Sequence, residues 1–559
     1  MRFLTSDPRS STSSWFNGLS AVAAGAWGTA AAVHYHSLGL TLAHYDARAH
    51  LVVARRVFDS LMPGWQQVGA VWLPLPHLLN ALPVQIDWFY RTGASAIAIS
   101  IASMALAAWA ISTLIHRATG SFAGGAVAAA LLMLNPNVLY LQSTPMTEPL
   151  LFATSFLAVM SIAEWTARVS RLSTPNLQIP TPNQLPSPNS QRRLSQAAGW
   201  SCVAAVLTRY EAWPIVATAI ALAFLVLVRR GIAVPAALRA VRGLALWPLW
   251  AIAAFLVNSK VTIGTWFIPS GFYVAENSAQ GHPWIALTQV WDGLVLLSGP
   301  VLPWIAVVSA FSILAAFLLP PNQPPPRLRR SAEALRAKAE GGSYSSAKEG
   351  DFFEIEAASR RAAVILPLAL VACAAVPLVA YFKGHPVRIR YDVPLVAAAA
   401  ALAGTAVALL PRRARGAAGL IVVALAVWQV RPFDATAPVI VESQREAPNK
   451  RGRAAVTRYL AAHWDGQPIM MSMGSLGHYM HDLSAGGFRV KDFLHEGTGE
   501  LWTHAARYPR LFVEWIAMEE RAEGGDGLHW RATHDPNFLR GYGRVAEGGG
   551  VALYRRLPK

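Results

Sequence analysis

Long runs of apolar residues, separated by short polar connections, fill most of the first 430 residues. Runs such as GAVAAALLMLNP and GTAVALLP belong to segments of about 20 residues, the length that crosses the hydrocarbon core of a bilayer. Because backbone groups in lipid must be paired within their own segment, each span should be a helix. The pattern predicts about eleven spans, at 16–38, 92–115, 121–140, 149–167, 196–208, 213–228, 243–260, 293–319, 362–381, 392–410 and 416–430.

The remaining residues, 431–559, have a different pattern. PIMMSM and RLFVEWIA are typical of strands, RAAVTRYLAAHW of an amphipathic helix, and RVAEGGGVALYRR of a hairpin with a glycine-rich turn. The sequence therefore predicts a transmembrane domain over 1–430 and a small α/β domain over 431–559. Within the second domain, SMGSLG fits a plain strand-to-helix turn better than a phosphate-binding turn, because one short glycine pair is weak evidence.

The basic residues assign a side of the membrane to each connection. Clusters such as PRRAR at 411–415 alternate along the chain with connections that are poor in lysine and arginine. Placing these clusters in the cytoplasm puts the N-terminus inside and, after an odd number of spans, residues 431–559 outside. We expect a multi-pass protein of the cell inner membrane; the alternative for the first span is a signal peptide cut near GTAAA.

Composition supports this interpretation and excludes others. Hydrophobic residues make up 54% of the 559 residues and charged residues 14%, against about 25% charged residues in ordinary soluble proteins. The net charge of +17 arises mostly beside apolar runs, so it indicates membrane topology and not a nucleic-acid partner. Cys202 and Cys373 lie inside apolar runs and provide no disulfide framework.

With this topology, several acids and arginines fall at the outer ends of different spans. The connections that hold them are 40–91, QSTPMTEPLL, LTRYEAWP and YFKGHPVRIRYDVPL, and the residues are Asp46, Glu148, Arg209, Glu211, Arg388 and Arg390. Charge at a span end is costly unless it is paired or functional, and arginine is disfavoured on the outer side. An anionic lipid headgroup would be a suitable partner for these arginines.

Three motifs in this order carry a resemblance to a known family. They are HYDARAHLVVARR after the first span, TPMTEPLL at the start of the fourth, and RYDVP at 390–394 before a late span. With its outer C-terminal domain, the chain resembles membrane glycosyltransferases of the GT-C superfamily. It resembles in particular the group of the protein O-mannosyltransferases and the lipid A aminoarabinose transferase (glycosyltransferase family 39-like). It departs from them at Ala47, where the family often has a second acid after Asp46.

The resemblance implies an inverting transfer of a sugar from a polyprenyl-phosphate donor to an acceptor hydroxyl of a protein, lipid or glycan on the outer face. The acceptor must lose a proton, so a carboxylate is needed beside it, and Asp46 is the expected general base, with Glu148 as the second catalytic acid. Arg390, with Arg209 and Arg388, is expected to bind the donor phosphate. The sequence does not distinguish mannose, arabinose or another sugar.

Structural alternatives stay open for three of these residues. They are Asp46 paired with Arg48 or Arg55, Glu148 as a charge at a helix N-terminus, and Arg390 neutralising Asp392 or Glu211. Sugar or acceptor contacts are expected from aromatic and polar residues of the outer loops, with interfacial or surface roles as the alternative. This second set comprises His50, Trp72, His77, Glu211, Tyr273, Glu276, Asn277 and Tyr391.

Three further hypotheses concern cofactors and function. His44, Asp46 and His50 raise the alternative of a divalent cation (Mg or Mn), but the two histidines are six positions apart and share no helical face, so no metal ligand is assigned. A transporter or flippase is the second functional class; the chain shows no obvious inverted repeat. A non-catalytic scaffold is the third.

Overall fold

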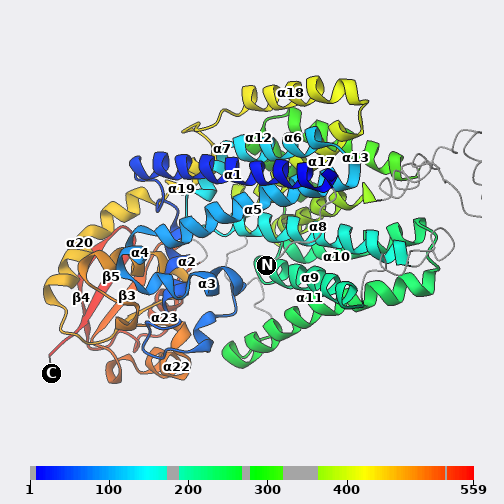
Figure 1. Cartoon of the computed structure of the whole chain (residues 1–559). Helices are drawn as coiled ribbons and strands as arrows, with labels where there is room; N and C mark the ends of the chain where they lie inside the picture. The colour runs from blue at the N-terminus through cyan, green and yellow to red at the C-terminus, as the bar shows by residue number, and fades with distance from the viewer. Residues whose placement is uncertain (1–7, 173–187, 267–276, 319–362, 523–524, 559) are drawn as a thin grey trace, which may run out of the picture.

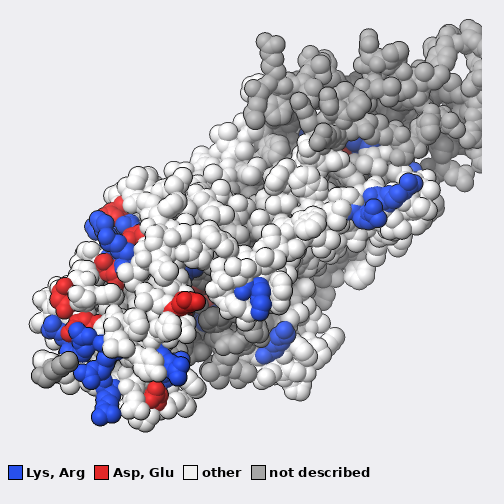
Figure 2. All heavy atoms as spheres, turned by 90° about the horizontal axis from the view of Figure 1, so that it is seen from below, with Lys and Arg blue, Asp and Glu red and all other residues white. Residues whose placement is uncertain are grey.

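The computed structural model describes residues 8–172, 188–266, 277–318, 363–522 and 525–558. Figure 1 shows a bundle of long helices with a mixed helix and sheet domain at one end. The charged side chains gather over that end in Figure 2, whereas the visible face of the bundle beyond it is mostly uncharged. This distribution is the one expected for a helical membrane protein with a domain in water.

The bundle contains most of the helices of the described chain. They are α1 (Pro8–Ser37), α5 (Ala94–Thr119), α6 (Phe122–Leu134), α7 (Pro136–Gln142), α8 (Glu148–Leu172), α9 (Pro188–Val206), α10 (Ala212–Arg229), α11 (Val234–Ile263), α12 (Pro283–Ser298), α13 (Val301–Leu318), η3 (Leu366–Ala374), α16 (Ala375–Phe382), η4 (Ile389–Asp392), α17 (Val393–Leu409) and α18 (Arg412–Gln429). Within the described residues, six helices are long and apolar enough to cross a membrane, or seven if the bent pair α6–α7 counts as one span. The chain is thus a multi-pass membrane protein, and the number eleven stays a prediction.

The structure breaks two predicted spans: 121–140 falls on α6 and α7, which are bent by 73°, and 293–319 is divided between α12 and α13. Residues 293–319 were expected to form a single helix, but α12 begins at Pro283 and ends at Ser298, and α13 begins at Val301. Gly299 has a φ of 74°, and Pro300 follows it. A residue in this conformation ends a helix, and proline cannot donate the next backbone hydrogen bond. The Gly-Pro pair was therefore a visible signal for the break.

The first outer connection folds into short helices beside the bundle. They are α2 (Tyr45–Arg55), η1 (Trp65–Val68), α3 (Leu75–Asn80), η2 (Pro83–Gln85) and α4 (Asp87–Thr92). In Figure 1, α2 lies where the bundle meets the C-terminal domain. Nine of the eleven residues of α2 are buried, although the helix carries two arginines, a histidine and an aspartate. These polar groups must consequently find partners inside the protein.

The C-terminal domain is an α/β unit around a five-stranded sheet. Its elements are α19 (Pro438–Ser443), α20 (Ala447–His463), β1 (Ile469–Met471), α21 (Met473–Leu483), η5 (Ser484–Gly486), η6 (Val490–Asp492), β2 (Phe493–Leu494), η7 (Glu496–Thr498), α22 (Glu500–Arg507), η8 (Pro509–Leu511), β3 (Trp515–Glu519), α23 (Gly527–His534), β4 (Tyr542–Gly548) and β5 (Val551–Arg556). The strand order is β2-β1-β3-β5-β4, with β2, β1 and β3 parallel and β3, β5 and β4 antiparallel. The predicted strands, helix and hairpin are confirmed; Gly549 and Gly550, both at positive φ, form the hairpin turn.

The turn between β1 and α21 binds a carboxylate of the protein itself. The Met473 amide donates to Glu496 Oε2 at 2.7 Å, and the Ser472 hydroxyl donates to Glu496 Oε1 at 2.5 Å. Glu496 therefore occupies the place that an anion would take at the start of α21. This agrees with a plain strand-to-helix turn at SMGSLG.

The C-terminal domain and α2 share one hydrophobic core. Leu51 and Val52 of α2 pack in the same cluster as Leu476, Tyr479 and Leu483 of α21. The ion pair of Arg48 in α2 with Asp482 in α21 supports this contact, and Gln67 Nε2 of η1 donates to the Gly497 carbonyl at 2.7 Å. The orientation of α2 thus depends on the domain that follows the last helix of the bundle.

Candidate functional site: a buried cluster of acids and arginines

Asp46 lies in the first turn of α2, the helix at which the bundle meets the C-terminal domain. His44 caps the helix, because its Nδ1 accepts the Asp46 amide hydrogen at 3.1 Å. The Asp46 carboxylate is buried and forms an ion pair with the guanidinium of Arg390. The alternatives are wrong, since Arg48 pairs with Asp482 and Arg55 pairs with Asp59 and Asp87.

Glu148 begins α8 and connects two arginines. Its Oε1 accepts a hydrogen bond of 2.9 Å from Arg209 Nη1 and lies 3.7 Å from Arg390 Nη1. The residue is fully buried, and its Oε2 has no hydrogen-bond partner among the described residues. Glu148 does stand in the first turn of a helix, as the structural alternative required, but it also contacts both guanidinium groups.

Arg209 and Glu211 come from the turn between α9 and α10. Arg209 Nη2 lies 2.6 Å from Glu211 Oε1, and its Nε lies 3.2 Å from both carboxylate oxygens. Arg209 Nη1 also donates to Thr147 Oγ1 at 3.0 Å. Glu211 is therefore a partner of Arg209, and not of Arg390 as one alternative held; it fixes the guanidinium toward Glu148.

Arg390 and Arg388 are placed by η4, immediately before α17. The Arg388 guanidinium lies 5.9 Å from the ring centroid of Tyr45, the neighbour of Asp46. Arg390 itself lies over the ring of Tyr391, at 5.1 Å from the centroid. Asp392, the other alternative partner of Arg390, accepts a hydrogen bond of 3.3 Å from the Tyr381 hydroxyl. The five predicted charged residues Asp46, Glu148, Arg209, Glu211 and Arg390 thus meet in one cluster.

Burial sets the electrostatics of this cluster. It raises the pKa of the Asp46 carboxyl, while Arg390 acts in the opposite direction and favours the charged form. Burial likewise holds the pKa of the His44 imidazole far below its usual range, with Arg390 and Arg388 adding to the effect. His44 is consequently neutral at pH 7, and its role is to orient the first turn of α2.

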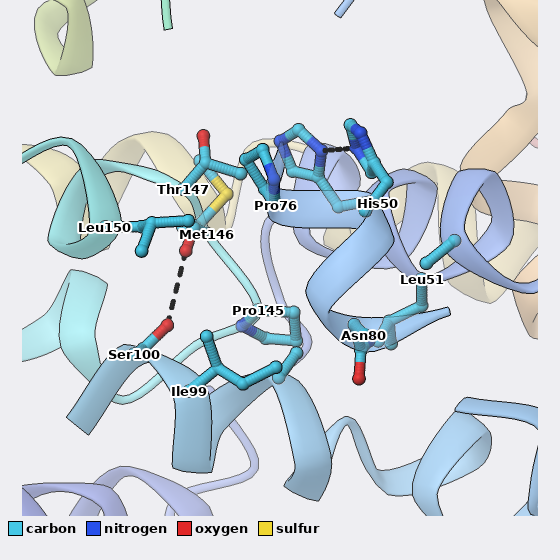
Figure 3. A pocket seen from close by; sticks show the side chains of 13 residues that line it. His50, Leu51, Pro76, Asn80, Ile99, Ser100, Pro145, Met146, Thr147 and Leu150 are labelled. Atoms are coloured by element: carbon cyan, nitrogen blue, oxygen red, sulfur yellow. Dashed lines mark hydrogen bonds between the residues drawn. The ribbon is translucent and has the colours of Figure 1, made fainter. Parts of the chain in front are cut away.

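A small pocket adjoins the cluster through Thr147. It has an empty volume of about 400 Å³, open solvent included, and its walls come from α2, α3, α5 and the start of α8. Figure 3 shows His50 at its edge. His50 Nδ1 lies 2.9 Å from His77 Nε2. The ring of Trp72 lies 4.1 Å from that of His50, between centroids. Burial lowers the pKa of His77 to about 3, so this imidazole is neutral at physiological pH.

The loop residues predicted to bind a sugar are only partly described. Tyr273 and Glu276 lie outside the described residues. Asn277 exchanges hydrogen bonds of 2.8 and 2.9 Å with Gln289 and donates to the His385 carbonyl at 2.9 Å. It joins its loop to the one before η4, and a contact with a sugar stays a prediction for it.

No signal in the sequence singled out Glu442, a further acid near the cluster. It lies in α19, which packs against η4 and α7, and it is 3% exposed. Its segment, VIVESQRE, is as rich in polar residues as a surface helix, so its burial could not be predicted. For the divalent cation considered above, the described part of the chain contains no group of three or more His, Cys, Asp or Glu placed to hold a metal ion.

Comparisons with known proteins add a likeness of fold. No family model matches the chain, and no curated protein matches it. The chain is similar in fold to ArnT from Cupriavidus metallidurans. For ArnT bound to undecaprenyl phosphate the TM-score is 0.45 at 14% identity, over 94% of this chain and 97% of ArnT. The apo state of ArnT gives the same TM-score and identity.

The archaeal oligosaccharyltransferase AglB from Archaeoglobus fulgidus is also similar. Its structure holds an inhibitory peptide and a dolichol phosphate; the TM-score is 0.41 at 11% identity, over 88% of this chain and 69% of AglB. ArnT and AglB are both GT-C membrane glycosyltransferases, the group whose fold the sequence motifs predicted for this chain.

Proposed function

We propose that this chain is an inverting glycosyltransferase of the cell inner membrane, which moves a sugar from a polyprenyl-phosphate donor to an acceptor hydroxyl at the non-cytoplasmic face. One observation carries the proposal. Asp46 and Arg390 form a buried ion pair, and Glu148 links this pair to Arg209. A candidate base and two cations for a phosphate thus stand together at the membrane end that carries the C-terminal domain, which we place outside the cytoplasm.

The proposed reaction uses Asp46 as the general base. The acceptor oxygen attacks the anomeric carbon, its proton passes to the Asp46 carboxylate, and the bond from that carbon to the phosphate oxygen breaks. The polyprenyl phosphate leaves with the bonding electrons. Since the acceptor attacks from the face opposite the phosphate, the configuration of the sugar inverts. The acceptor is a hydroxyl of a protein, lipid or glycan.

The arginines stabilise the charge that forms on the leaving phosphate. A charge-assisted hydrogen bond contributes about 1.5–3 kcal/mol, which is worth roughly one to two decades in rate if it is made mainly in the transition state. Arg390 and Arg209 supply such donors in a buried place, where fixed charges act more strongly than in water. We propose that these guanidinium groups suffice at the phosphate and that transfer continues in EDTA without added Mg or Mn.

Donor binding also prepares the base. Without donor, Arg390 neutralises Asp46, and a carboxylate paired in this way is a poor proton acceptor. A phosphate that takes over one edge of the Arg390 guanidinium weakens this pair and returns basicity to Asp46. The order of events is therefore donor first and acceptor second.

The test is transfer from synthetic undecaprenyl-phosphoryl sugars by the purified chain in lipid nanodiscs. Asp46→Asn should preserve folding and abolish transfer, because the amide cannot accept the proton. Asp59→Asn is the matched control: Asp59 follows the same helix but pairs with Arg55, so this variant should retain transfer. Full transfer by Asp46→Asn would refute the base assignment, and sugar-lipid flux across vesicles without any glycosylated product would favour a transporter.

A further inference from the structure

Glu442 is a buried acid whose carboxyl group stands out among the described residues. Both Oε1 and Oε2 are inaccessible to water and lack a partner among the described residues, and the side chain is 3% exposed. Leaving a buried carboxyl group without a hydrogen-bond partner destabilises the fold, so a protein rarely keeps one without a use. The molecule has thus placed two free acceptor oxygens in its interior.

Contacts with two neighbouring elements hold α19, and therefore Glu442, in one position. The Val439 amide donates to Asn137 Oδ1 of α7 at 3.0 Å, and the backbone of α19 packs against η4. The charges that act most strongly on Glu442 are those of Arg390 and Arg388, followed by Arg445 and Asp46. Because α19 contacts η4, which carries Arg390 and Asp392, Glu442 lies in an element that borders the acid and arginine cluster.

A second unpartnered oxygen lies on the same side. Asp392 accepts from Tyr381 through Oδ2, whereas its Oδ1 is buried with no partner in the described structure. Glu442 is near enough to Asp392 for their charges to interact. Two carboxyl groups on neighbouring elements disfavour a phosphate beside them, so the donor phosphate belongs with the arginines and a different part of the donor belongs beside Glu442.

The oxygens of these two acids that lack a partner among the described residues favour a ligand rich in hydrogen-bond donors. Burial raises the pKa of the Glu442 carboxyl, and Arg390 and Arg388 favour its charged form. When it is ionised, its two oxygens accept in one plane, and a pair of neighbouring hydroxyl groups presents two donors at a similar spacing. We propose that Glu442 binds hydroxyl groups of the transferred sugar and determines which sugar the site accepts. This inference rests on the glycosyltransferase function proposed above and assigns sugar specificity to one residue.

The consequence is a strong dependence on the hydroxyl groups that Glu442 contacts. A site built to bind a hydroxyl rejects a ligand that lacks it, because the buried polar group is then left unpaired. Such a residue also destabilises the empty protein. Replacing Glu442 by a neutral residue should consequently weaken sugar recognition and raise the melting temperature, a combination that a purely structural hydrogen-bonding role does not produce.

The experiment compares lipids with and without a sugar. Binding of undecaprenyl phosphate and of undecaprenyl-phosphoryl mannose, glucose, galactose and arabinose is measured for the wild type and for Glu442→Gln in nanodiscs. The wild type should prefer at least one sugar lipid over undecaprenyl phosphate. Glu442→Gln should lose about tenfold of that preference, keep its affinity for undecaprenyl phosphate, and melt no lower than the wild type.

A matched control separates this effect from a general disturbance. Glu446→Gln makes the same chemical change four residues along, where the carboxylate pairs with Arg453 of the C-terminal domain, and it should keep the sugar preference. An unchanged preference in Glu442→Gln, or no sugar preference in the wild type, would overturn the role of Glu442. A wild type that binds none of these lipids would instead refute the proposed function.

Discussion

Arg209 Nη1 lies 2.9 Å from Glu148 Oε1, and the same carboxylate oxygen lies 3.7 Å from Arg390 Nη1. Glu148 is therefore the anion that holds two cations beside each other inside the protein. Without it, the two guanidinium groups would repel each other in a place where water screens them poorly. The site depends on this carboxylate for its assembly as well as for its chemistry.

Glu148→Gln should therefore lower stability and transfer together. Removing one partner of a buried ion pair costs about 3–5 kcal/mol when the remaining charge is left uncompensated; here Glu211 still pairs with Arg209, so we expect the lower part of that range. The melting temperature in detergent measures the effect. Glu164→Gln on the same helix is the control, because Glu164 pairs with a half-exposed Arg117 and should change the melting temperature little.

The pH profile of transfer should report Asp46. Burial raises the pKa of this carboxyl above its usual 3.8, and Arg390 lowers it. A base must be deprotonated, so kcat/KM should fall as the pH drops through this pKa. Arg390→Gln removes the cation and should move the acid limb to higher pH. Arg390→Lys keeps the charge and should leave the limb near that of the wild type. Equal limbs in both variants would show that the titrating group is not Asp46.

The acids and arginines of the site could be predicted because the order of apolar runs and basic clusters indicates on which side of the membrane each residue lies. Asp46, Glu148, Arg209, Glu211 and Arg390 all border apolar runs on the side with few basic residues, and the structure brings them together. Their individual partners could not be predicted. Arg48 and Arg55 are close to Asp46 in the sequence, but the helical geometry of α2 directs them to Asp482, Asp59 and Asp87.

Other features depend on contacts that no local pattern encodes. Glu442 lies in a short polar segment, and only the packing of α19 on α7 and η4 buries it. The apolar run at 293–319 has the composition of one span, and two residues, Gly299 and Pro300, decide that it is not one helix. The strands and the hairpin of the C-terminal domain were easier to predict, because the alternation of apolar and polar residues and the glycine pair of a turn are local signals.

Asp482→Asn should lower the rate of transfer although Asp482 lies outside the cluster. This residue pairs with Arg48, two residues from Asp46 on α2, and so fixes the helix that presents the proposed base. A small displacement of a catalytic group costs roughly ten- to a hundredfold in rate. We expect a fall in kcat with little change in donor affinity. Lys450→Gln removes only the half-exposed outer partner of Asp482 and should have little effect; equal losses in both variants would contradict a role for the Arg48 pair.

The stability of the C-terminal domain should depend on Glu519. Burial raises the pKa of this carboxyl to about 7, which outweighs the attraction of Arg453. The folded protein therefore binds a proton more tightly than the unfolded chain, and the contribution to stability is full below the unfolded value near 4.5 and lost as the pH rises through about 7. In Glu519→Gln, the melting temperature should depend less on pH between about 4.5 and 7 than it does in the wild type. A slope as steep as that of the wild type would contradict this assignment.

The most direct test of the account is a structure of the full chain with undecaprenyl phosphate in a lipid nanodisc. We predict density for the phosphate within hydrogen-bond distance of the Arg390 guanidinium, with Arg209 or Arg388 as a second donor and the Asp46 carboxylate turned toward an open space for the acceptor. A phosphate bound away from all three arginines, or Asp46 facing the opposite side of the membrane from it, would contradict the proposed reaction.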